Sequence, residues 1–172
     1  MVRYADPGVA EWVESNGGPL VVVPETALLS WLGSDGDGSE DDYDRACGVD
    51  SWTGLVPVGQ ENVLVLGGDP ASTTFLPEHD LFVRWCAAES EAELLDSIGA
   101  AISGAAWEPD LHWAISGPVL LFDAVWSGIE IAGEDHLRVA LEPGCYAVRA
   151  AYVEPDLLTS LVLVQLRRLP HQ

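Results

Sequence analysis

The sequence predicts a mainly β (α+β) fold of antiparallel sheets, in a single domain over residues 1–172. Short apolar runs rich in β-branched residues recur along the chain, and glycine and proline turns such as residues 67–70 separate them, which is the pattern of a β-rich core. Only one segment, at about 90–103, is clearly signalled as a helix. With 48% hydrophobic residues and seven tryptophans, the chain can fill a core despite its high charge.

Eight strands are expected from the apolar runs. Residues 20–23 are wholly apolar and lie between prolines at 19 and 24, which is typical of a buried strand. In residues 81–86 alternate side chains point to opposite faces of the strand, and Cys86 is expected to be a small buried side chain. Arg84 and Arg149 lie among apolar strand residues. They are expected to be buried and paired with carboxylates, because a bare buried charge is costly. A turn at 142–144 is expected to close a hairpin. The expected strands are residues 20–23, 55–58, 63–66, 81–86, 119–122, 137–141, 146–152 and 161–166.

The best helix signal begins at Ser90. Ser90 and Glu93 have the spacing of a capping box, and apolar residues follow on one face up to Ile102. Residues 25–32 are expected to form two further helical turns that end at Gly33. Residues 33–44 carry six carboxylates and three glycines, and we expect them to form a solvated loop.

The two halves of the chain, at about 12–86 and 107–166, resemble each other faintly. Trp12 precedes the apolar run at 18–23 as Trp113 precedes the run at 117–122, and each run is followed by a tryptophan and a glycine. An ancient duplication would explain these matches, and it would give two related β units packed together. A single sequence leaves that duplication open.

The charge of the chain is strongly unbalanced. Seven basic residues, all arginine, stand against 28 acidic residues and give a formal net charge of −21. So negative a surface repels nucleic acid and anionic membranes, because phosphate binding needs lysine and arginine. It attracts basic partners and speeds their encounter. Solubility alone is the competing explanation for the acidity.

The cysteines and the hydropathy pattern favour a cytoplasmic location. Cys47, Cys86 and Cys145 are an odd number at wide spacing, which argues against a disulfide framework and for a reducing compartment. The N-terminus has no apolar signal core, and no run of the chain approaches the roughly 18 apolar residues that span a bilayer.

No motif in the sequence carries a complete chemical site. The chain has no Gly-x-Ser-x-Gly elbow, no Cys-x-x-Cys pair and, lacking lysine, no phosphate loop of the Gly-Lys type. Asp35 and Asp37 resemble the start of a calcium loop, but Glu40 and Ala46 stand where that loop requires a glycine and a bidentate glutamate. We therefore expect no catalytic residue, no cofactor and no metal ion.

Several segments resemble the immunity protein 21 family of bacterial polymorphic toxin systems. They are Trp12-Val-Glu-Ser-Asn-Gly-Gly-Pro-Leu-Val-Val-Val-Pro-Glu, Asp42-Tyr-Asp-Arg-Ala-Cys, Asp69-Pro-Ala-Ser-Thr-Thr-Phe-Leu-Pro, Leu81-Phe-Val-Arg-Trp and Pro143-Gly-Cys-Tyr-Ala-Val-Arg. Together they cover most of the chain, from about Trp12 to Glu154. The resemblance implies a mainly β protein that protects its producer by binding a toxin, and it brings no catalytic residues with it.

We therefore expect a toxin-neutralising protein whose acidic surface docks on a basic toxin, with a nuclease fitting the charge best. Two other functions stay open. One is a small-molecule binding module with an aromatic-lined pocket between the β halves, and the other is an enzyme that uses His79 with nearby carboxylates. The sequence does not fix the oligomeric state. The expected contact residues are Asp35, Asp37, Glu40, Asp41, Asp42, Tyr43 and Asp44, with an exposed Trp52 as anchor.

Overall fold

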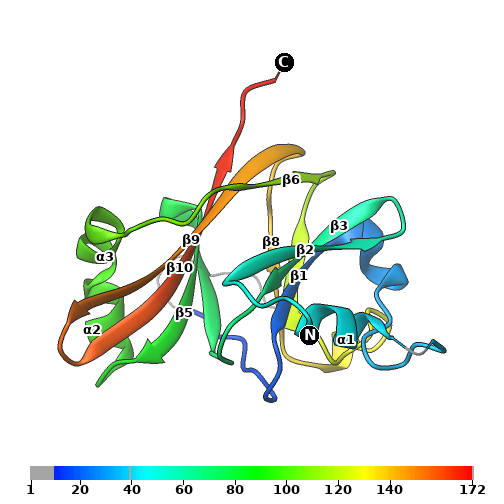
Figure 1. Ribbon diagram of the computed structural model, residues 1–172, viewed down its shortest axis with the longest axis horizontal. Coiled ribbons are helices and arrows are strands. Elements are labelled where there is room, and N and C mark those ends of the chain that lie inside the picture. The colour runs from blue at the N-terminus through cyan, green and yellow to red at the C-terminus, as the bar shows by residue number, and fades with distance from the viewer. Residues whose placement is uncertain (1–9, 39, 172) are drawn as a thin grey trace.

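Two five-stranded antiparallel sheets face each other across the main core (Figure 1). The computed structural model describes residues 10–38 and 40–171. Helices α2 and α3 lie on the outer side of one sheet, and α1 lies at the opposite side of the molecule (Figure 1). The mainly β fold that the sequence predicts is confirmed.

The first sheet has the strand order β2-β3-β1-β7-β8. Its central strand, β1 (Leu20–Pro24), is buried throughout, as its uninterrupted apolar sequence predicts. It pairs on one side with β3 (Glu61–Leu66) and on the other with β7 (Val119–Asp123). The edges are β2 (Thr53–Val58) and β8 (His136–Val139).

The second sheet has the order β4-β5-β10-β9-β6. Its longest strands, β9 (Gly144–Asp156) and β10 (Thr159–Arg168), form a hairpin. Strand β5 (Leu81–Ala87) pairs with β10, and β4 (Thr73–Leu76) and β6 (Leu111–Ile115) are the edges. A bridge from Val13 to Thr73 ties the N-terminal segment to β4.

Three apolar clusters occupy the space between and outside the sheets. The central cluster lies between them and includes Leu64 and Leu121 of the first sheet and Val148 and Val162 of the second. The outer face of the first sheet is covered by the 3-10 helix η1 (Glu25–Ser30), by α1 (Asp42–Cys47) and by residues around the 3-10 helix η3 (Ile131–Gly133). Helices α2 (Glu91–Asp96) and α3 (Ile98–Gly104) cover the second sheet.

The secondary structure departs from the sequence expectations at a few elements. The segment at 90–103 is helical but is divided at Ser97, whose hydroxyl donates to the Leu94 carbonyl at 2.6 Å and competes with the helix ladder. Residues 25–30 form a 3-10 helix, and the last three residues of the expected solvated loop, 42–44, belong to α1, which spans residues 42–47. The short strands β4 and β6 were not expected.

The turn at 142–144 does not close a hairpin. Strand β8 before it belongs to the first sheet, and strand β9 after it belongs to the second. The turn therefore carries the chain across the sandwich. Tyr146 fixes this crossover, since its hydroxyl donates to the Glu142 carbonyl at 2.7 Å.

Strands from both halves of the chain contribute to each sheet. The two segments whose sequences match best, β1 and β7, pair side by side at the centre of the first sheet, with Val22 opposite Leu121. The matching runs at 63–65 and 146–148 lie in different sheets. The duplication remains a prediction.

Candidate functional site

The acidic segment, residues 33–44, leads from the end of η1 into α1. Asp41 is the N-cap of α1, and its Oδ1 accepts a hydrogen bond from the Asp44 backbone at 2.7 Å. The Asp44 carboxylate in turn accepts a hydrogen bond from the Asp41 backbone N–H at 3.4 Å, which completes a capping box. Two of the six carboxylates thus hold the helix terminus in place.

Asp42 ties the acidic segment to its surroundings. Its Oδ2 accepts from the Leu32 backbone at 2.8 Å, and its Oδ1 pairs with the Arg45 guanidinium at 2.5 Å. Arg45 also donates to the Pro57 carbonyl at 2.8 Å, so α1 is bound both to the segment that follows η1 and to β2. Arg45 is therefore already engaged at this face.

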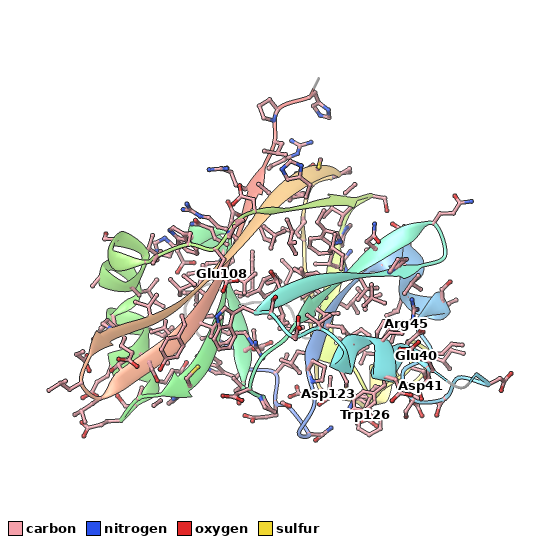
Figure 2. The ribbon with its side chains drawn as sticks, in the orientation of Figure 1. Glu40, Asp41, Arg45, Glu108, Asp123 and Trp126 are labelled. Carbon is pink, nitrogen blue, oxygen red and sulfur yellow. The ribbon has the colours of Figure 1, made fainter. Side chains whose placement is uncertain are left out.

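The remaining three carboxylates, of Asp35, Asp37 and Glu40, project into solvent. All three residues are exposed, and their carboxylates accept no hydrogen bond from the described part of the chain. Figure 2 shows Glu40 and Asp41 at the same end of the molecule as Trp126. Asp35, Asp37 and Glu40 thus form an exposed acidic edge without a basic partner in the described part of the chain.

Tyr43 and Trp52 are engaged within the protein. Tyr43 packs against the cluster under the first sheet, and a Cβ added at Gly18 would lie 2.6 Å from the Tyr43 hydroxyl. A hydrogen bond with Cys47 is the main reason that the Tyr43 pKa is raised. Trp52 is partly buried, not exposed as expected, and it stacks on Tyr152 with ring centroids 6.0 Å apart.

An apolar patch, formed by Leu29, Leu32 and Ile129, lies next to the acidic segment. Their side chains are 72%, 44% and 75% exposed. Two hydrogen bonds join the segments that carry them, from Gly128 N to the Trp31 carbonyl at 2.8 Å and from Ser34 N to the Val125 carbonyl at 3.1 Å. No local signal in the sequence predicts this patch, because Ile129 is distant from Leu29 and Leu32 along the chain.

The segments that carry the apolar patch are closely packed and hydrogen-bonded. Trp31 is fully buried beneath it, and its indole donates to the Ala124 carbonyl at 3.3 Å. Gly128 approaches so closely that an added Cβ would lie 1.8 Å from the Leu28 carbonyl oxygen. Asp123 holds the following turn through a 2.9 Å bond from Val125 N. The exposed leucines and isoleucine are therefore presented on a packed framework.

The family model of Immunity protein 21 matches residues 11–159. The chain belongs to the immunity protein 21 family. No curated protein and no solved structure matches the chain. The matched residues include both the acidic segment and the apolar patch. Membership indicates an immunity protein, whose partner is a cognate toxin.

The histidine-based alternative gains no support from the geometry of this immunity protein. His79 is exposed at the end of the 3-10 helix η2 (Pro77–His79), where its carbonyl accepts from the Gln165 side chain at 3.2 Å. The next residue, Asp80, has a left-handed φ of 48°, and its carbonyl accepts from Leu166 N. These contacts explain the segment as a turn that is fastened to β10. Among the described residues, no three His, Cys, Asp or Glu side chains group around a metal position.

Apolar side chains of the central cluster fill the space between the two sheets, and each sheet contains strands of both halves of the chain. An aromatic-lined pocket between the halves stays a prediction. The surface does hold hollows, one of about 580 Å³ beside Trp12, Glu14 and His136. No helix of the described residues is long and apolar enough to cross a membrane.

The arginines and the cysteine of the second sheet differ from the sequence expectation. Arg84 is buried, but its guanidinium donates to the carbonyls of Gly67 and Asp69 and to no carboxylate of residues 10–38 or 40–171. Arg149 is only partly buried, bonds Gln165 and lies 4.0 Å over the Trp107 ring. Cys86 is exposed at the end of β5, and desolvation of its sulfur raises the pKa of its thiol, which disfavours a thiolate nucleophile.

Proposed function

We propose that this immunity protein neutralises a basic toxin in the cytoplasm by binding it through the acidic segment, so that its bulk covers the toxin's active site. The observation that supports this most is the solvent-directed edge of Asp35, Asp37 and Glu40. In this mechanism Asp41, Asp42 and Asp44 shape the contact by holding α1, and Tyr43 and Trp52 support it from within the fold.

Charge supports a cationic partner. A net charge of −21 produces a strong field around the molecule, and such fields raise the rate of association with a cationic partner by roughly 10- to 1,000-fold at low salt. A nuclease toxin fits best, since an enzyme that binds nucleic acid needs a positive surface for the phosphates. Inhibition then requires no reaction, because a docked acidic protein excludes the substrate.

Co-purification tests the proposal directly. The protein encoded by the adjacent gene should be captured by this chain, and its activity should be lost in the complex. Capture should weaken as salt rises from about 50 to 500 mM, because the Debye length falls from roughly 14 Å to 4 Å. A failure to bind that adjacent protein at low salt would overturn the proposed function.

Neutralising the exposed edge should slow association. In the triple variant Asp35→Asn, Asp37→Asn and Glu40→Gln, we expect the association rate constant for the adjacent-gene protein to fall by about tenfold at low salt, because local charge steers the encounter. Stopped-flow or surface plasmon resonance measures this rate.

A matched triple variant controls for net charge. Glu78→Gln, Glu108→Gln and Glu142→Gln remove an equal number of charges, three, from exposed positions outside the acidic segment. We expect it to slow association by less than about threefold. Equal slowing in both variants would mean that overall charge, and not the acidic segment, guides the toxin.

A further inference from the structure

Among the described residues, five of the six exposed large apolar side chains lie in two places, and the sixth, Tyr152, stacks on Trp52. One is the apolar patch of Leu29, Leu32 and Ile129, and the other is the tip of the β9–β10 hairpin, where Leu157 is fully exposed and Leu158 is 60% exposed. Exposed apolar side chains that gather in this way commonly mark contact surfaces. The two places lie on different sheets, so they can be separated by experiment.

The apolar patch is built in the way that an interface centre is built. Its side chains come from two chain segments, η1 with its continuation and the turn after β7, which backbone hydrogen bonds lock together. Trp31 fills the space below them. Little ordering entropy is left to lose on binding, which is the condition under which buried area converts well into affinity.

Carboxylates surround the apolar patch. Asp42 bonds the backbone of Leu32 itself, and the acidic segment with Asp35 follows directly in the chain. On the other side Glu130 follows Ile129, and its carboxylate accepts from Ser127 N at 3.0 Å. An apolar centre with a charged rim is the usual anatomy of a specific protein interface.

The hairpin tip lacks this construction. Leu157 and Leu158 are adjacent residues of one turn, and the Leu158 backbone donates only to Asp156 of the same turn. Acidic residues Glu89 and Glu93 line a hollow next to it, so charge does not separate the two places. What separates them is that backbone hydrogen bonds join the two segments of the apolar patch, whereas none joins the hairpin turn to α2 in the described part of the chain.

We infer that the apolar patch is the centre of the toxin-docking face, and that the toxin presents an apolar side chain ringed by arginine or lysine to it. This inference rests on the proposed function and adds the position of the anchor. The acidic edge steers the toxin, and Leu29, Leu32 and Ile129 hold it after contact.

Two double variants test the inference. Leu29→Asn with Ile129→Asn removes the anchor without changing charge, and Leu157→Asn with Leu158→Asn is the matched change at the hairpin tip. Isothermal titration calorimetry against the adjacent-gene protein should show about 100-fold weaker binding for the first variant, as loss of two central anchors predicts. The tip variant should bind within about threefold of the original chain. All four side chains are exposed, so both variants should fold, which circular dichroism checks.

Hydrogen exchange on the unmodified chain gives a second measurement. Binding should slow the exchange of amides in residues 28–35 and 125–130 and leave residues 156–159 unchanged. If the original chain binds the toxin but the tip variant is the one that loses affinity, the inference is wrong and the hairpin is the anchor. If the patch variant keeps toxin binding while a dimer of this chain dissociates, the patch is a contact between copies and the inference is also wrong. If the original chain does not bind at all, the proposed function fails, and this inference fails with it.

Discussion

Replacing Trp113 by alanine is expected to lower the free energy of unfolding by about 3–5 kcal/mol. Trp113 lies on β6, is fully buried and belongs to the central cluster. Its indole nitrogen donates to the Asn62 carbonyl on β3 at 2.8 Å, so one side chain both fills the core and bonds the opposite sheet. Alanine would leave a cavity and an unpaired carbonyl. Urea denaturation followed by circular dichroism measures the change.

Two further substitutions separate the causes. Trp113→Phe keeps most of the apolar volume but loses the bond to Asn62, and it should cost about 1–3 kcal/mol. Trp107→Ala is the matched change at a partly buried tryptophan that stacks on Arg149, and it should cost about 1–2 kcal/mol. A loss for Trp113→Ala no larger than that for Trp107→Ala would contradict the role given to Trp113 between the sheets.

This substitution also distinguishes stability from docking. Trp113 belongs to the central cluster, whereas Trp31 beneath the apolar patch belongs to the cluster on the outer face of the first sheet. Trp113→Ala protein that remains folded should therefore bind the toxin with its original affinity, even though less of it is folded at a given urea concentration.

Local sequence pattern predicted the strands whose apolar residues form long runs. Strand β1 is apolar at every position. In β5, the two-residue period of a strand puts Phe82 on the face opposite to Leu81 and Val83, as the clusters confirm. Strands β4 and β6 are short, and their polar residues, such as Thr73 and His112, dilute the pattern. Helix α1 was hidden because its N-cap is an aspartate inside an acidic run.

Connections across the sandwich could not be predicted from local pattern. The turn at 142–144 has the residues of a hairpin, yet the strands on either side join different sheets. A turn signal reports that the chain reverses or bends, but it does not report which neighbour the next strand finds. That choice depends on burial of both faces, which is a property of the whole fold.

In the candidate site too, the features set by local sequence could be predicted, and those set by tertiary structure could not. Composition alone identified an acidic segment, because charge is a local property. The apolar patch depends on tertiary structure, since Leu29 and Leu32 look like the buried face of a helix, and Ile129 is distant in sequence. Within the 3-10 helix η1, Ala27 is buried and Leu29 lies in solvent.

Replacing Arg84 by alanine is the second substitution with a large expected effect, a loss of about 3–5 kcal/mol in the free energy of unfolding. The side chain is fully buried and donates to the carbonyls of Gly67 and Asp69, which closes the loop after β3 onto β5. Burial lowers the Arg84 pKa to about 10, so the guanidinium stays charged at neutral pH. Alanine would remove the volume and leave both carbonyls without these donors.

Arg84→Met tests whether the buried charge itself contributes. Methionine fills much of the same space and removes the cost of desolvating the guanidinium, whose Nε has no partner among the described residues. Replacing a buried charge by an apolar side chain of similar volume is often close to neutral, so we expect a loss of no more than about 2 kcal/mol. Arg167→Ala, at an exposed arginine 3.3 Å from Asp110, should change stability by less than about 0.5 kcal/mol.

The stabilities of the alanine and methionine variants of Arg84 show how the loop after β3 of the first sheet is held against β5 of the second. A methionine variant nearly as stable as the original chain would mean that Arg84 acts mainly by filling space. A methionine variant as unstable as the alanine variant would mean that its two hydrogen bonds to the 67–69 loop dominate. In that second case loop closure depends on the guanidinium, and hydrogen exchange at the amides of residues 67–69 should rise in both variants.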